Sequence, residues 1–397
     1  MSTRDSNKWD IMFFYLSILI YPLNIILSAS LKFIGMNYFA SKTIFILYLL
    51  VVIFEIIILF KFSISLKRVA YLIGIYFIYI LLYLTAPVAI KWKFTDLNML
   101  FIYVFYLPYA VLILSRIKDF SLLFESDTIR NINAMLIIGT FFAKYLLKDS
   151  TGYMPFSYTL LPIWIMFSIS LLGKSSFIGY IIVIFIFLEG VMYGARGPII
   201  FYIIGMIACR IVIGKKTVKR QKTVQDFIIL IIKGVCIALV GIFISIQLIS
   251  NNTNHSYIIS KFSEGTIIAS SGRDYLTNLG IRYLKHMGLN INGVFFDRTL
   301  LPNNIYIHNF ILETILSFGW IFGTMILVGL LWYIVYTFCK ADKNNKRVVI
   351  FLVSAYFFRY FLTGSIYDDY IFIVFLSLLY AVNNIRNEKN VLYYDKY

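Results

Sequence analysis

The chain has 397 residues, of which 60% are apolar and 14% charged, and its formal net charge is +17. Soluble globular proteins contain about 45–50% apolar and about 25% charged residues, so this composition excludes an ordinary soluble domain. Lys and Arg lie mainly in short connectors between apolar runs, which excludes the basic folded face that nucleic-acid binding requires. We therefore expect an all-α, polytopic membrane protein with the lipid bilayer, and no nucleic acid, as a partner.

Apolar runs of bilayer-spanning length predict about twelve transmembrane helices. Their limits are 11–31, 43–60, 69–89, 98–115, 132–147, 156–173, 176–193, 198–213, 227–249, 310–338, 348–364 and 368–385. The first run is too long for a cleaved signal peptide and lacks a small-residue cleavage site, so it is expected to remain as a span. Cys209, Cys236 and Cys339 have no metal-type spacing, and we predict neither a metal nor another cofactor.

The basic residues of the connectors alternate in the phase that the positive-inside rule requires. With a cytoplasmic N-terminus, the inner connectors carry most of the Lys and Arg residues, so both termini are expected in the cytoplasm. The chain then divides into nine N-terminal spans (1–249), a large extracytoplasmic loop (250–307), and three C-terminal spans with a cytoplasmic tail (308–397).

The loop is far longer than the usual connection of about 4–6 residues. Its segment RDYLTNLGIRYLKHMG, residues 273–288, predicts an amphipathic helix that ends near Gly288. The apolar arc consists of Tyr275, Leu276, Leu279, Tyr283 and Met287. Arg282 falls on the adjoining polar arc. Such a helix can lie on the bilayer surface or cap a cavity.

Two short motifs place an arginine at the outer membrane boundary. In YGARGP (193–198), two glycines bracket Arg196 just before a predicted helix, where a helix N-terminus favours an anion. The alternative is a tight hairpin whose arginine extends to lipid headgroups. In SSGRDYL (270–276), Arg273 stands near the start of the loop helix, and the alternative is a solvated loop arginine.

A third motif, NNIYIHNFILETILSFGWIFG (303–323), places His308 and Asn309 at the threshold of the tenth span. An imidazole can transfer a proton near neutral pH, although an interfacial histidine without a special task is the alternative. Glu313 lies deeper, where an ionisable group costs roughly 2.5–3.5 kcal/mol, so it calls for a partner or a wet cavity.

Further features of the C-terminal spans could support this site. Gly319 and Gly323 form a GxxxG step at which another helix can approach closely. Arg359 lies toward the outer end of the eleventh span, and Asp368 and Asp369 begin the twelfth. Either aspartate could pair with Arg359 or cap its helix, and two carboxylates are too few ligands to predict a metal.

In one topology all these charged groups lie on the outer side of the membrane. Arginines that hold a diphosphate and a base that accepts a hydroxyl proton are what glycosyl transfer from a lipid-diphosphate donor requires. The arginines would neutralise the leaving group without a metal.

The order of GARGP, a long outer loop with SSGRD, and HNFILETILSFGWIFG resembles the bacterial O-antigen polymerase and ligase superfamily, whose Wzy-type members polymerise repeat units of capsules and O-antigens. The resemblance implies metal-independent, inverting transfer from an undecaprenyl-diphosphate-linked oligosaccharide to an oligosaccharide acceptor at the outer face of the plasma membrane. A chain-length regulator is a further candidate partner.

Carried onto this chain, the resemblance implies that Arg196 and Arg273 hold the diphosphate and that His308 acts near the acceptor hydroxyl or the diphosphate. The candidate substrate contacts are Asn309, Glu313, Arg282, Arg359, Asp368 and Asp369. A ligase that moves finished glycan to another acceptor would use similar chemistry. A flippase or other transporter of the lipid-linked sugar is the alternative of another class, although transporters commonly bind near the midplane between repeated halves.

Overall fold

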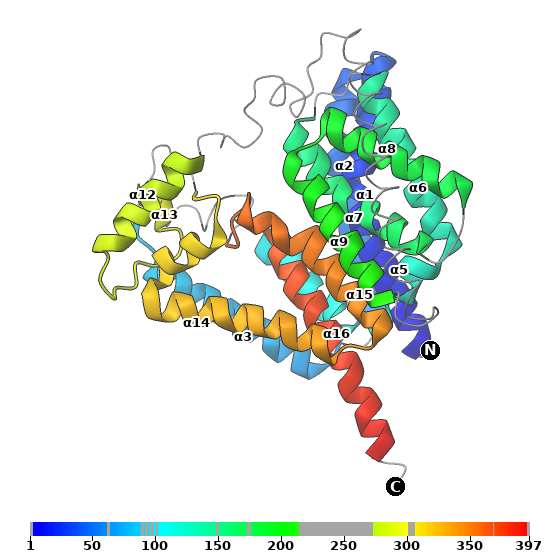
Figure 1. Cartoon of the computed structure of the whole chain (residues 1–397). Helices are drawn as coiled ribbons and strands as arrows, with labels where there is room; N and C mark the ends of the chain where they lie inside the picture. The colour runs from blue at the N-terminus through cyan, green and yellow to red at the C-terminus, as the bar shows by residue number, and fades with distance from the viewer. Residues whose placement is uncertain are drawn as a thin grey trace, which may run out of the picture.

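The computed structural model describes residues 3–61, 64–88, 91, 94, 96, 99–100, 102–147, 151–172, 176–213, 273–300, 306–367 and 369–394. Every regular element in these ranges is helical (Figure 1), so the all-α prediction is confirmed for them. The predicted ninth span (227–249) and the first part of the large loop (250–272) lie outside the described residues.

The predicted spans that fall in the described ranges coincide with helical segments. The elements are α1 (Thr3–Phe33), α2 (Asn37–Lys61), α3 (Leu66–Thr85), η2 (Ile102–Tyr106), η3 (Tyr109–Ile113), η4 (Leu114–Arg116), α5 (Ser121–Glu125), α6 (Asp127–Tyr145), α7 (Tyr153–Leu171), α8 (Phe177–Tyr193), α9 (Arg196–Ile213), α12 (Arg273–His286), α13 (Asp297–Leu300), α14 (Phe310–Lys340), α15 (Lys343–Leu352), η7 (Val353–Phe357), η8 (Phe358–Phe361) and α16 (Tyr370–Tyr394). By length and composition, α1 from Asn7, α2, α3, α7 and α14 can each cross a bilayer, so the chain is a multi-pass membrane protein.

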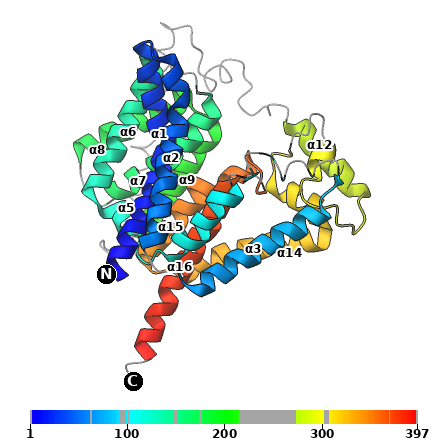
Figure 2. The same ribbon diagram turned by 180° about the vertical axis from the view of Figure 1, so that it is seen from behind.

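Helix α7 forms the centre of the bundle. Almost all of its residues from Phe156 to Ser170 are buried, and it packs against α1, α6, α8 and α9. The first described residues of α1 and the last of α16 lie at the same end of the structure (Figure 1). Helices α12 and α13 gather beside the start of α14, apart from the α1, α6 and α7 group, as both views show (Figure 2).

Side-chain caps explain where several helices begin. The side-chain oxygens of Ser126, Ser176, Asn309 and Asp342 accept hydrogen bonds from backbone N–H groups in the first turns of α6, α8, α14 and α15. A cap of this type pairs a backbone N–H group of the first turn that has no partner within the helix. Such a group is costly to leave unpaired next to lipid. The polar residue before each of these four helices thus marks where the helix starts.

Two predicted spans are irregular helices. Residues 102–113 and 353–357 contain π-helical turns, and residues 358–361 continue as a 3₁₀ helix. Interruptions of this kind are rare in globular helices and are frequent at functional sites. Both irregular segments contribute side chains to the cavity described below.

The tenth span is divided by a sharp kink. Gly319 has φ 77° and ψ 173°, which splits α14 into a short buried helix before it and a long apolar helix after it. A Cβ at Gly319 would lie 2.7 Å from the carbonyl oxygen of Asn290, and one at Gly323 would lie 2.8 Å from the Cα of Ile315. The structure therefore differs from the expected GxxxG contact, because the close neighbours of both glycines are a loop and the preceding turn instead of another membrane helix.

Replacement of Gly319 by alanine should lower the free energy of unfolding by about 1–3 kcal/mol, because the positive φ and the nearby Asn290 carbonyl both oppose a side chain. Gly329 is the matched control, since it lies in the same helix and a Cβ added there would meet open space. Its replacement by alanine should be neutral or stabilising by up to about 1 kcal/mol. Equal thermal unfolding of the two purified variants in detergent would contradict the kink.

Candidate functional site

Several segments that are distant in sequence meet around Tyr158, a buried residue near the start of α7. The guanidinium carbon of Arg359, from η8, lies 5.3 Å from the centre of the Tyr158 ring. On another side, a Cβ at Gly197 would lie only 2.8 Å from the Tyr158 hydroxyl oxygen. The backbone N–H of Ala195 donates to the Ser157 hydroxyl at 3.0 Å. The turn just before Arg196, the half-buried first residue of α9, is thereby attached to α7.

Arg273 brings the large loop to the same place. It is the first residue of α12, and its Nη2 lies 4.0 Å from the sulfur of Met154, one helical turn before Tyr158. Its positive charge acts on both Tyr158 and His308. Arg273 therefore connects the loop helix, the bundle centre and the imidazole.

His308 is half-buried in the short segment before α14. Its ring meets the ring of Tyr306 edge-on, with centroids 4.4 Å apart. The Nδ1 atom is buried and has no hydrogen-bond partner among the described residues. Burial lowers the pKa of His308, and the charge of Arg273 lowers this pKa further. The imidazole is consequently neutral at pH 7 and able to accept a proton.

The backbone on both sides of His308 is held by side chains. The Asp297 carboxylate accepts a hydrogen bond from the Ile307 N–H at 2.8 Å. The Asn309 side-chain oxygen accepts from the N–H groups of Ile311 and Leu312 at 3.0 and 3.3 Å. Asn309 thus caps α14, and this role already uses the side-chain oxygen that was a candidate for substrate binding.

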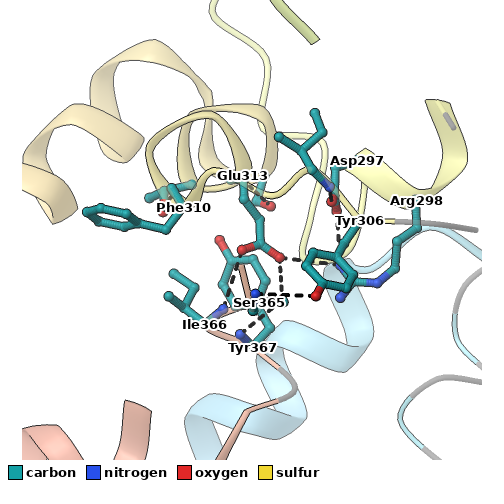
Figure 3. A network of polar contacts seen from close by, with 12 residues as sticks. Asp297, Arg298, Tyr306, Phe310, Glu313, Ser365, Ile366 and Tyr367 are labelled. Carbon is teal, nitrogen blue, oxygen red and sulfur yellow. Dashed lines mark hydrogen bonds and ion pairs between the residues drawn. The ribbon is translucent and has the colours of Figure 1, made fainter. Parts of the chain in front are cut away.

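A buried ionic network lies next to this segment and includes Asp297, Arg298 and Glu313 (Figure 3). The Arg298 side chain is 1% exposed, and its Nη1 lies 3.1 Å from Asp297 Oδ1 and 3.4 Å from Glu313 Oε1. Its guanidinium also covers the rings of Phe295 and Tyr306, at 4.4 and 5.5 Å from their centroids. Arg298 therefore joins the loop, α14 and the residue that contacts His308.

Glu313 connects this network to the segment before α16. The Ser365 hydroxyl donates to Glu313 Oε1, and the Ile366 N–H donates to Oε2 at 3.3 Å. Both carboxylate oxygens of Glu313 thus have partners inside the protein. The partner that its burial requires is Arg298, so Glu313 stabilises the site from within instead of facing a substrate.

Arg359 and Asp369 form the other ion pair of the site. Arg359 Nη2 lies 3.3 Å from Asp369 Oδ2, and Asp369 Oδ1 also accepts from the Ile371 N–H at 3.0 Å. The aspartate therefore performs both roles that the sequence allowed, pairing and helix capping. Asp368 lies outside the described residues. Arg282 is exposed on the opposite side of α12 from its packed face, and the structure does not bring it to this cluster.

Sequence reasoning missed several residues of the site. Arg298 and Asp297 stand in a loop without a motif, and Tyr158 is one of 31 tyrosines. A further buried carboxylate, Glu189 in α8, accepts from Thr140 at 2.6 Å and from the Trp164 indole N–H at 2.9 Å. A charged residue within an apolar run is the one signal that could have identified Glu189.

Within the described part of the chain, no group of three His, Cys, Asp or Glu side chains could hold a metal ion. Comparisons with protein-family models, with curated proteins and with solved structures found no match to this chain.

Replacement of Arg298 by methionine should lower the free energy of unfolding by about 3–5 kcal/mol, since it leaves buried carboxylates without their cation. The control is Arg282→Met, which removes an exposed arginine of α12 and should change stability by less than about 0.5 kcal/mol. Adding Glu313→Gln to Arg298→Met should cost less than the sum of the single losses. Denaturant titrations that give additive losses would contradict the network.

Replacement of Arg273 by glutamine should raise the pKa of His308, because a positive charge that opposes protonation is removed. As the pH is lowered, the neutral form of the His308 imidazole would then be lost at a higher pH than in the wild-type protein. Nitrogen-15 NMR titration in lipid nanodiscs measures this pKa, with His308→Gln to assign the resonance. Arg282→Gln should leave the pKa unchanged, and an equal shift in that control would contradict direct action by Arg273.

Proposed function

We propose that the protein is a membrane glycosyltransferase that joins undecaprenyl-diphosphate-linked oligosaccharide repeat units into a surface polysaccharide. The observation that carries the proposal is the arrangement around Tyr158, where Arg273, Arg359 and the turn just before Arg196 gather beside the neutral imidazole of His308. Two arginines that can hold a diphosphate, Arg273 and Arg196, together with one base are the groups that transfer from a diphosphate donor requires.

In the proposed reaction, the bond between the donor sugar C1 and the diphosphate oxygen breaks as C1 bonds to an acceptor hydroxyl oxygen. His308 takes the proton of that hydroxyl. The diphosphate leaves on the lipid carrier with its negative charge stabilised by the arginines. Arg273 and Arg196 are assigned to the diphosphate, and Arg359, whose charge is partly balanced by Asp369, is assigned to the sugar side.

We propose further that the chain crosses the bacterial plasma membrane twelve times with both termini in the cytoplasm and the site facing outward. In support, the described ends of the chain lie at the same end of the structure (Figure 1). The site also combines the starts of α7, α9, α12, α14 and α16, which that topology places at or near the outer boundary. A ligase would use the same groups, because only the acceptor differs. Charges gathered at one end favour a transferase over a transporter.

Chromosomal His308→Gln and Arg273→Gln variants should lose at least about 100-fold of their long-chain polysaccharide while the protein remains in the membrane, because proton transfer or leaving-group stabilisation is removed. The measurement is the product ladder on a gel, with immunoblotting of the enzyme. Arg282→Gln, which removes an exposed arginine of the same loop helix, should give a normal ladder.

A deletion strain separates the alternative functions when the gel is combined with analysis of the carrier-lipid fraction and of the leaflet in which the donor lies. Single repeat units in the deletion strain support the polymerase. Long chains that stay on the lipid carrier would identify a ligase instead, and donor that accumulates on the cytoplasmic leaflet would identify a flippase. A normal ladder in both the His308→Gln and Arg273→Gln strains would contradict the assigned roles.

A further inference from the structure

A partly open cavity adjoins the candidate site and shares two of its residues. Its wall includes Tyr158 and Arg359, and it extends between α1, η3, α7, η7 and α16. The wall also contains the hydroxyl-bearing side chains of Tyr106, Tyr356 and Tyr370. The Ser17 hydroxyl, which also lines it, already donates to the Phe14 carbonyl at 2.7 Å.

Two polar atoms of the cavity residues lack hydrogen bonds. The Nε of Arg359 and the hydroxyl of Tyr356 are both buried without a partner among the described residues, and Tyr356 is only 6% exposed. Buried donors are nearly always paired in native proteins, because an unpaired one costs about 1–3 kcal/mol. A cavity with two such donors in its wall is therefore expected to hold a polar molecule.

The backbone around the cavity is also irregular. Tyr106 lies in one π-helical segment, Tyr356 lies in another, and Arg359 follows in the 3₁₀ turn. A π-helical turn inserts a residue into a helix and changes the direction of the side chains that follow. Two separate helices thus depart from regular geometry at the cavity, which is unexpected for a wall that only packs against its neighbours.

The charge and the aromatic rings of the cavity wall indicate the class of ligand. Arg359 is paired with Asp369 at 3.3 Å, so the two groups together carry no net charge and do not favour a phosphate. A lipid chain would leave the buried Tyr356 hydroxyl and the Arg359 Nε without hydrogen bonds. The stacked rings of Tyr106 and Tyr370, 3.9 Å apart, add aromatic surface. Hydroxyl donors and acceptors beside aromatic rings match a sugar ring, which has polar edges and apolar faces.

We propose that this cavity is the subsite for the terminal sugar of the acceptor glycan. The inference rests on the proposed function and assigns its acceptor side. Tyr356 and Arg359 donate hydrogen bonds to sugar hydroxyl groups, and Tyr158 separates this subsite from the arginines that hold the diphosphate. The donor and the acceptor are therefore recognised by different residues, and substitutions in the cavity affect one of them only.

The test is a two-substrate assay of the purified protein in lipid nanodiscs, with donor and acceptor varied separately. Tyr356→Phe removes one hydroxyl group and should raise the KM for the acceptor about 3- to 10-fold while the KM for the donor stays unchanged. Tyr71→Phe, an exposed tyrosine of α3, is the matched control and should leave both values unchanged. If the wild-type protein polymerises normally but Tyr356→Phe and Arg359→Gln leave the acceptor KM unchanged, the acceptor subsite is wrong. The proposed polymerase function would stand.

Binding is measured separately from turnover by saturation-transfer NMR. The probe is the lipid-free repeat-unit oligosaccharide released by mild acid from the host's own carrier lipid. It should bind the wild-type protein, bind Tyr356→Phe more weakly, and persist in the presence of inorganic diphosphate. Binding that is unaffected by the substitution, or displacement by diphosphate, would overturn the subsite. Tyr356-dependent binding without any polymerisation would support the subsite and remove the proposed reaction.

Discussion

The candidate site depends on one guanidinium that is buried with two carboxylates. Transfer of Arg298, Asp297 and Glu313 out of water is costly, and the cost is offset only where the geometry satisfies all three groups. Here the arginine contacts both acids and two aromatic rings, while the acids accept further hydrogen bonds from Ile307, Ser365 and Ile366. The described loop segment that contains Asp297 and Arg298 is thereby fixed to the start of α14 and to the segment before α16.

This constraint determines how His308 is presented. The imidazole stands between Ile307, whose N–H is bound by Asp297, and Asn309, which caps α14. Tyr158 of α7 and Arg359 of η8 contact each other in the bundle, and the charge of Arg273 acts on both Tyr158 and His308. In the proposed reaction, His308 on a fixed segment, cations on separate helices and the cavity beyond Tyr158 would let the donor and the acceptor approach from different sides. Preorganisation of this kind is what a transferase requires, because it has no metal with which to orient a diphosphate in the proposed mechanism.

Much of the fold was predictable because lipid imposes strong constraints on sequence. Each described apolar run is helical, and polar caps such as Ser126 and Ser176 mark where helices begin. Helix α12 was found from its period, and the pairing of Asp369 with Arg359 was one of two roles expected. The kink at Gly319 was not predicted, because a glycine in an apolar run is equally compatible with close helix packing.

The residues of the site were harder to predict, because they come together only through the three-dimensional fold. Glu313 required a partner, but nothing in the sequence distinguished Arg298 from the other arginines of the chain, since the pairing depends on how the loop folds back onto α14. Tyr158 and Tyr356 lie in apolar runs where an aromatic residue is ordinary, and their significance depends on a cavity that only the three-dimensional arrangement creates.

The central claim is that the arginines and the imidazole form one diphosphate site at the outer end of the bundle. A cryo-EM map of the protein in nanodiscs with undecaprenyl diphosphate tests it most directly. We expect the two phosphates beside Arg273 and the Arg196 turn, within reach of His308, and weaker density in Arg273→Gln. Phosphate density at the opposite end of the bundle, or unchanged density in that variant, would contradict the account.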